Sequence, residues 1–175
     1  MDKKYIMTAF SKDRPGIVAD LTEIIYENGG NLEDSTMTSM LDEFVIILLF
    51  SAKEEIFEKQ LSSDCRRLEK EKGITAFVRT VETTARKTEE KFNKKTINVE
   101  GVDQAGIVYK ISRFLADSDI NIENLTSQRI ISPESGTAIY TMELKVQVPE
   151  KISIAQLEEG LSRVGEALNL NILIE

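Results

Sequence analysis

The chain has 175 residues, of which 22 are Lys or Arg and 30 are Asp or Glu, so its formal net charge is −8. It contains no His and a single Cys, which excludes an imidazole base, a histidine-ligated metal and a disulfide framework. The sequence shows no signal peptide and no membrane-spanning segment, which indicates a cytoplasmic protein without a membrane partner.

The charge is unevenly distributed along the chain. Residues 1–85 hold 11 basic and 16 acidic groups, residues 96–175 hold 6 and 12, and residues 86–95 hold 5 and 2. Direct binding to a nucleic acid needs clustered Lys and Arg, and neither large segment has such a cluster. We therefore expect no direct nucleic-acid partner, and we expect residues 86–95 to form a charged linker.

Two motifs occur twice at a constant offset of 90 residues. The hexapeptide DRPGIV at 13–18 returns as DQAGIV at 103–108, and the tripeptide NLE at 31–33 returns as NIE at 121–123. Recurrence in register predicts a duplicated unit, with a first domain at 1–85 and a second at 96–175.

The first half predicts the order β-α-β-β-α-β. Pro15 suits the first helical position, and four apolar residues spaced i, i+4, i+7 and i+8 from Ile17 form one helical stripe. Gly29 and Gly30 end that helix. The expected elements are strands at 4–10, 31–40, 44–50 and 74–81 and helices at 15–28 and 54–72, the second with Phe57, Leu61 and Leu68 on one face.

The second half predicts the same order. Ser153 and Gln156 have the spacing of a capping box at the start of its second helix. The expected strands lie at 96–102, 121–131, 137–148 and 170–174, and the helices at 106–118 and 154–168. Each half is thus expected to be an α+β unit with two helices on one face of a four-stranded antiparallel sheet.

The third strand of the first half is apolar throughout from Phe44 to Phe50, whereas its counterpart in the second half alternates apolar and polar residues. Helices cover only one face of a sheet, so we expect the other face of this strand to contact protein. The predicted interface residues are Ile46, Leu48 and Phe50. Shielding of the strand by the chain's own connector is the alternative.

Catalytic residues are not evident. Cys65 and the scattered Ser and Thr residues have no partner at a recurring spacing, and the paired acids suit solvated helix surfaces. We predict no catalytic residue, no metal site and no cofactor.

The first strand-to-helix loop is the candidate binding site. Gly16 lies at the start of a helix, where free N–H groups and the helix dipole favour a small carboxylate. Arg14 and Lys12 can assist the carboxylate, and Asp13 can receive an ammonium group. We expect Asn31, at the entry of the next strand, to lie within a few ångströms and to offer both donors and acceptors. The structural alternative is that Asp13 and Asn31 satisfy backbone groups at the helix ends and that Gly16 permits close packing.

These motifs resemble the ACT domain, a ferredoxin-like regulatory module that binds small molecules. The two copies, together with residues 31–35 and 83–86, resemble the glycine cleavage system transcriptional repressor family. The resemblance implies amino-acid binding at interfaces between sheets, at the following matching positions: Asp13, Arg14, Pro15, Gly16, Ile17, Asn31, Asp103, Gly106, Ile107 and Asn121. It also implies a homo-oligomer that acts through a DNA-binding regulator protein.

The second copy departs from the motif. Gln104 and Ala105 replace Arg and Pro, and Asp119 stands where the first copy has Gly29. We expect its site to be weaker, altered or purely structural.

The favoured function is a non-enzymatic sensor of a small amino acid of the glycine or serine type, which binds at a domain or subunit interface and controls a transcriptional regulator. The alternative is an interaction or oligomerisation module without a physiological ligand. An acylphosphatase-like enzyme with the same order of elements is disfavoured, because the phosphate-holding loop of those enzymes is not found here.

Overall fold

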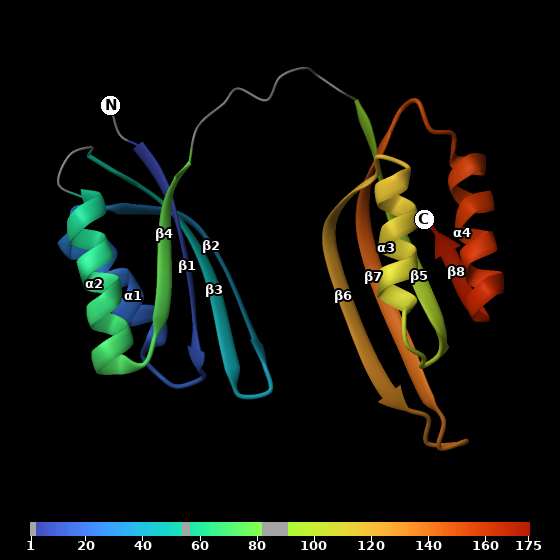
Figure 1. The fold of residues 1–175 in the computed structure, drawn as a ribbon, viewed down its shortest axis with the longest axis horizontal. Coiled ribbons are helices and arrows are strands. Elements are labelled where there is room, and N and C mark those ends of the chain that lie inside the picture. The colour runs from blue at the N-terminus through green and yellow to red at the C-terminus, as the bar shows by residue number, and fades with distance from the viewer. Residues whose placement is uncertain (1–2, 54–56, 82–90) are drawn as a thin grey trace. The chain divides into compact units, whose positions relative to one another are not determined.

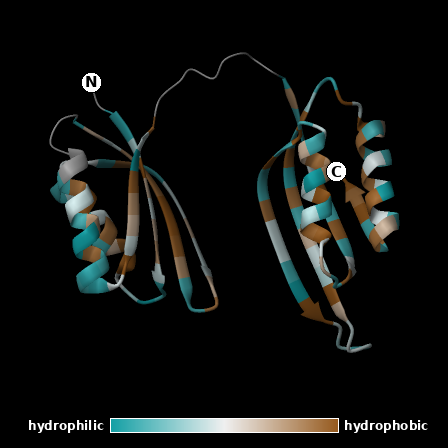
Figure 2. Cartoon of the chain, in the orientation of Figure 1, coloured by the Kyte–Doolittle hydropathy of each residue, from teal (hydrophilic) through white to brown (hydrophobic). Residues whose placement is uncertain are grey.

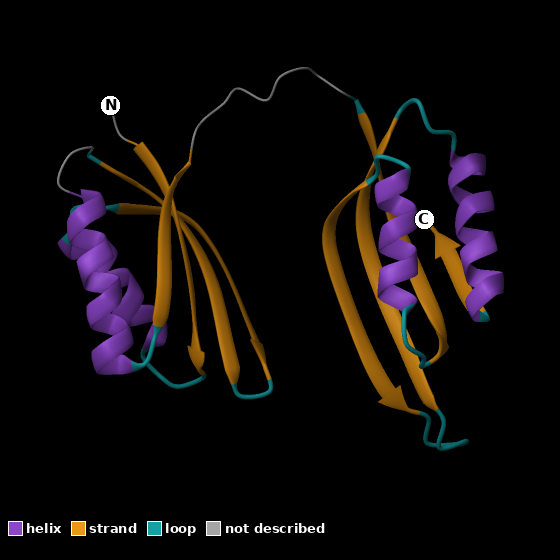
Figure 3. Cartoon of the chain, viewed as in Figure 1, coloured by secondary structure: helices purple, strands orange, loops and turns teal. Residues whose placement is uncertain are grey.

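The computed structural model describes residues 3–53, 57–81 and 91–175. The chain divides into two compact units, residues 1–85 and 86–175. In each unit both helices lie on the same side of the sheet (Figure 3).

The first unit has the predicted β-α-β-β-α-β order, and its antiparallel sheet has the strand order β2-β3-β1-β4 (Figure 1). The first helix ends as the sequence predicts, since the left-handed Gly29 follows its end. It begins at Ile17 and not at Pro15, because Gly16 has the left-handed φ of 93° and is the residue before the first helical position. The elements are β1 (Lys3–Lys12), α1 (Ile17–Glu27), β2 (Asn31–Met40), β3 (Glu43–Ala52), α2 (Phe57–Lys72) and β4 (Thr75–Val81).

The second unit repeats this topology with the order β6-β7-β5-β8. The predicted capping box is present, since the Ser153 side chain accepts from the Gln156 N–H and the Gln156 side chain accepts from the Ser153 N–H. The elements are β5 (Phe92–Val102), α3 (Ile107–Asp117), β6 (Asn121–Ile131), β7 (Ala138–Pro149), α4 (Ile154–Leu168) and β8 (Leu170–Ile174).

Part of the predicted linker belongs to a strand. Residues 92–95 of the predicted linker belong to β5, because their backbone pairs with residues 146–149 of β7. Residues 86–90 lie outside the described residues, as do residues 54–56 of the predicted helix and the side chain of Phe57.

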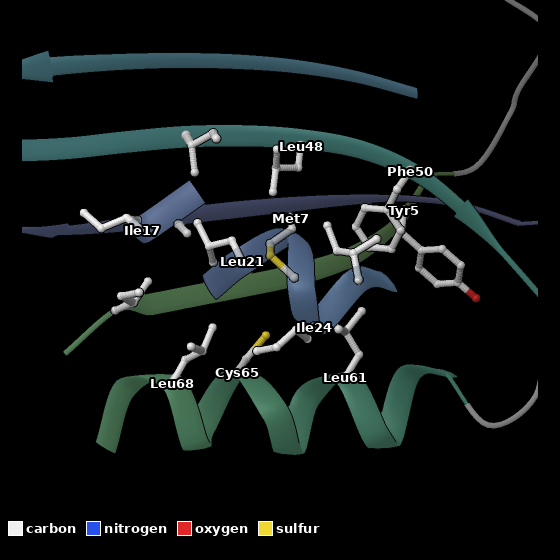
Figure 4. Packing of buried hydrophobic residues seen from close by; sticks show 14 of the residues in the cluster. Tyr5, Met7, Ile17, Leu21, Ile24, Leu48, Phe50, Leu61, Cys65 and Leu68 are labelled. Atoms are coloured by element: carbon white, nitrogen blue, oxygen red, sulfur yellow. The ribbon is translucent and has the colours of Figure 1, made fainter. Parts of the chain in front are cut away.

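The core of the first unit lies between the sheet and the two helices (Figure 4). Leu61, Cys65 and Leu68 extend from α2 toward the sheet, and Met7 and Leu48 of the sheet belong to the same buried cluster (Figure 4). The predicted stripe of α1 is buried in full, at Ile17, Leu21, Ile24 and Ile25.

The predicted interface on β3 is wrong in its choice of face. Ile46, Leu48 and Phe50 are 2%, 0% and 0% exposed, because their side chains point toward the helices and form part of the core. Val45 and Ile47 occupy the opposite face and are 39% and 47% exposed. The strand is apolar on both faces (Figure 2), so its composition could not show which face the helices cover.

Candidate ligand-binding site

The loop between β1 and α1 is positioned by the neighbouring hairpin. The backbone N–H of Asp13 donates to the carbonyl of Asp42, in the turn between β2 and β3, at 2.8 Å. Gly16 follows in the left-handed conformation with φ 93°, which favours glycine over residues that carry a Cβ. A Cβ at this position would meet only the Arg14 side chain, at an ordinary 3.7 Å. Gly16 therefore serves the backbone conformation and not close packing, so the packing alternative is wrong.

The start of α1 has no side-chain cap. The first helical hydrogen bond runs from the Asp20 N–H to the Gly16 carbonyl at 2.9 Å, so the amide groups of residues 17–19 have no acceptor within the helix. Asp13 does not cap the helix, which removes the structural alternative for this side chain. An anionic ligand is stabilised by such amides and by the helix dipole.

A guanidinium lies beside these amides. Arg14 donates through Nη2 to Asp20 Oδ2 at 2.8 Å, and Lys72 Nζ at the end of α2 donates to Asp20 Oδ1 at 2.5 Å. The hydrogen bond from Lys72, and then that from Arg14, lowers the pKa of Asp20 below its ordinary value of 3.8. Asp20 thus holds Arg14 at the helix start, a role that the spacing of the motifs did not reveal.

Lys12 is engaged elsewhere. Its Nζ lies 2.5 Å from Asp42 Oδ2 and 3.7 Å from Glu43 Oε1, at the turn between β2 and β3. Of the two cations predicted to assist a carboxylate, Arg14 is therefore the one placed at the helix start.

The Asp13 carboxylate is exposed and accepts no hydrogen bond and forms no ion pair among the described residues. Ile17 points the other way and is 2% exposed in the core. The loop thus presents an acceptor for an ammonium group at Asp13 and donors for a carboxylate at the helix start, which together match a zwitterion.

Asn31 lies at the opposite end of the unit. It is paired with Ser51, which is paired with Lys4 on β1, whereas the loop follows Lys12 at the other end of the same strand. Lys12 lies eight positions after Lys4 along β1, a span of roughly 27 Å at 3.4 Å per residue. The prediction that one unit brings Asn31 within a few ångströms of Gly16 is wrong, and Asn121 and Gly106 are separated in the same way.

The two repeated acids at the strand entries are neutralised locally. Lys4 Nζ lies 2.6 Å from Glu33 Oε2, and at the same offset of 90 residues Lys94 Nζ lies 3.5 Å from Glu123 Oε1. The hydrogen bond from Lys4 lowers the pKa of Glu33. The recurrence of these acids therefore has a structural explanation.

The second loop has the same backbone and different side-chain contacts. Gly106 has φ 95° and also begins a helix without a side-chain cap, and the Asp103 N–H donates to the Ala138 carbonyl at 2.9 Å. Gln104, which replaces Arg14, donates to the carbonyl of Leu168 at 2.5 Å. The Asp103 carboxylate accepts from Arg129 Nε at 2.7 Å. The adjacent Ile107 is buried in the core, as Ile17 is.

The outer faces of the two sheets also differ. In the first unit Phe10 and Phe77 lie side by side with ring centroids 6.2 Å apart, next to Val45 and Ile47 across the strands. In the second unit the corresponding surface is largely polar, with Glu100, Gln128, Thr141 and Glu143 among its side chains.

No group of three or more metal-ligating side chains is found within the described ranges 3–53, 57–81 and 91–175. In the same ranges no helix combines the length and the apolar composition needed to cross a membrane.

Comparisons with known proteins give the family context. The ACT domain family matches residues 4–79. The chain is 23% identical over 167 residues to the glycine cleavage system transcriptional repressor of Escherichia coli K12. This match covers 94% of the chain and 85% of the repressor. A UPF0237 protein of Methanopyrus kandleri is 28% identical over 74 residues, or 42% of this chain and 82% of that protein.

Two solved structures share the fold of the whole chain. An unknown protein from Galdieria sulphuraria has a TM-score of 0.84 at 25% identity, and the match covers 100% of this chain and 98% of that chain. A provisionally assigned glycine cleavage system transcriptional repressor has a TM-score of 0.72 at 20% identity, with coverage of 100% and 97%. Residues 4–79 match the ACT domain family, the second half has the same ferredoxin-like fold, and the chain is similar to the Escherichia coli repressor along most of its length.

Proposed function

We propose that this tandem ACT-type protein is a non-enzymatic sensor of a small amino acid, of the glycine or serine type. The ligand binds at the loop between β1 and α1, with its carboxylate on the free amides of α1 beside Arg14 and its ammonium group on Asp13. The observation that carries this proposal is the uncapped start of α1 at Gly16 next to an unpaired carboxylate. A zwitterion satisfies both groups, whereas a simple anion satisfies only one.

Asn31 enters this site from a second copy of the protein. It lies at the far end of β2 from its own loop, so it reaches a ligand only where the loop of one subunit meets the strand entry of another. This arrangement makes the ligand part of a subunit interface, and a ligand that binds one arrangement of subunits better than another shifts the equilibrium between them.

The regulated partner is a DNA-binding transcription regulator. The similarity to the Escherichia coli glycine cleavage system transcriptional repressor supports this role. The net charge of −8 disfavours direct contact with DNA, so the effect on transcription passes through the partner protein.

Calorimetric titration with glycine, L-serine and L-alanine tests the ligand site. Gly16→Val is compared with Gly106→Val, which places the same strained residue at the equivalent φ of the second unit. We expect saturable binding that is lost in Gly16→Val and kept in Gly106→Val. Absence of heat from a folded protein with all three amino acids, or equal loss in both variants, would contradict the proposal.

A mixing experiment tests the contribution of the second copy. Gly16→Val and Asn31→Ala should each abolish or weaken binding alone. If the two residues come from different subunits, a refolded mixture of the two variants contains sites with an intact loop and an intact Asn31, and binding returns in part. Failure of the mixture to bind would place both residues in one subunit's site, and undiminished binding by Asn31→Ala alone would leave Asn31 outside it.

The second candidate function is an interaction module without a ligand. The exposed apolar surface of Phe10, Val45, Ile47 and Phe77 favours it, because such a patch is costly to leave in water. Ile47→Asp should then reduce the oligomer to smaller species in sedimentation velocity, while Glu143→Asp on the polar sheet leaves it unchanged. An unchanged oligomer in Ile47→Asp would exclude this face as the interface.

A further inference from the structure

The two copies of the loop differ in what meets the first aspartate. In the first unit the Asp13 carboxylate has no partner among the described residues. In the second unit the equivalent Asp103 accepts from Arg129 Nε at 2.7 Å. Both aspartates are held by the same backbone bond to the hairpin, through Asp42 and Ala138 respectively, so the loops are positioned alike.

Arg129 has a defined counterpart in the first unit. The offset of 90 residues places Ser39 on β2 where Arg129 stands on β6. The strand register agrees with this equivalence. Ser39 pairs with Phe44 of β3, two residues after Asp42, whose carbonyl anchors the first loop. Arg129 pairs with Tyr140 of β7, two residues after Ala138, whose carbonyl anchors the second loop. A serine is uncharged and short, so it forms no ion pair with Asp13, whereas the arginine at this position of the second unit reaches Asp103.

We infer that Arg129 occupies the ammonium subsite of the second loop and that each chain therefore has one functional amino-acid site, in the first unit. This inference rests on the proposed function, since the subsite is defined by the ligand's ammonium group at Asp13. The guanidinium is a positively charged donor to the carboxylate, as the ligand's ammonium would be. A ligand at Asp103 must displace Arg129 and then lie beside its charge.

The rest of the second loop agrees with a site that is closed to ligand. Gln104 donates to the carbonyl of Leu168 and brings no positive charge to the start of α3. The carboxylate of a ligand would thus find the amides of α3 but no counterpart of Arg14. Ser39 becomes a residue of the first site by the same argument, because its small side chain leaves Asp13 open.

Titration calorimetry with glycine and L-serine on the full chain tests the inference through stoichiometry. We expect one site per chain in the wild type and two sites in Arg129→Ser. In the double variant Gly16→Val/Arg129→Ser we expect one site per chain, at the second loop. Arg163→Ser is the matched control, since it removes another exposed arginine, one that pairs with Glu159 on α4, and changes the net charge equally. The reverse change, Ser39→Arg, should weaken binding at the first site on the order of tenfold.

Two wild-type sites of equal affinity, or an unchanged stoichiometry in Arg129→Ser, would overturn the inference. A wild type that binds neither amino acid overturns the proposed site at Asp13 and with it the count of one site per chain, and Arg129→Ser then tests separately whether Arg129 blocks the second loop. One new site in that variant supports it, and none overturns it.

Discussion

Truncation of two adjacent residues of β3 should have very different effects on stability. Leu48 is 0% exposed and packs in the core between the sheet and the helices, whereas Ile47 is 47% exposed on the outer face. Leu48→Ala removes buried methyl and methylene groups and leaves a cavity, at a cost of about 2–5 kcal/mol in the free energy of unfolding. Ile47→Ala removes a side chain that is only about half buried, so its cost is about 1 kcal/mol.

Urea unfolding followed by circular dichroism measures both variants. The second unit has its own core and provides an internal reference, because its transition should not move in either variant. Repeating the measurement at lower protein concentration identifies subunit effects, because a stabilising contribution of Ile47 that comes from a subunit interface becomes smaller as the protein is diluted. Equal, concentration-independent losses for Leu48→Ala and Ile47→Ala would refute the assignment of the two faces of β3.

Three further predictions concern ionisation, reactivity and capping. The hydrogen bond from Lys72 lowers the pKa of Asp20, so the ionised carboxylate stabilises the fold above pH 3.8, and this stabilisation is lost as the pH falls through the lowered pKa. Asp20→Asn should therefore destabilise the first unit at pH 7, and the difference in stability from the wild type should shrink as the pH is lowered in acid denaturation. Burial raises the pKa of the Cys65 thiol to about 11, so its reaction with a disulfide reagent at pH 8 should be slow in the native protein and fast in urea, and rapid native labelling would contradict its burial. Ser153→Ala removes the capping box of α4 and should cost about 1 kcal/mol in thermal or urea unfolding of the second unit, and a loss confined to the first unit would refute this assignment.

The two copies show how far local patterns determine this protein. Three predicted features are encoded by short stretches of sequence, and the structure has all three. They are the repeated motifs of the two halves, the apolar stripe of α1 and the capping box at Ser153. Glycine at position 16 is likewise dictated locally, because the backbone there needs a positive φ that few other residues adopt without strain.

Three features depended on contacts between distant residues. An all-apolar strand carries no alternation, so only the placement of the helices decided that Leu48 is buried and Ile47 exposed. The motif of the loop and the motif of Asn31 are close in sequence, yet the length of α1 carries them to opposite ends of the unit.

The state of the two aspartates was decided in the same way. Asp13 and Asp103 are the same residue type at the same position of the repeated motif. Only Asp103 pairs with an arginine, Arg129, which lies 26 residues further along the chain, on β6. The sequence by itself therefore determined the duplicated fold and the backbone of each loop, because these depend on local conformational preference and on the periodicity of apolar residues. Tertiary structure alone decided which faces and which charges remain open, because burial and ion pairing depend on which distant side chains the sheet brings together.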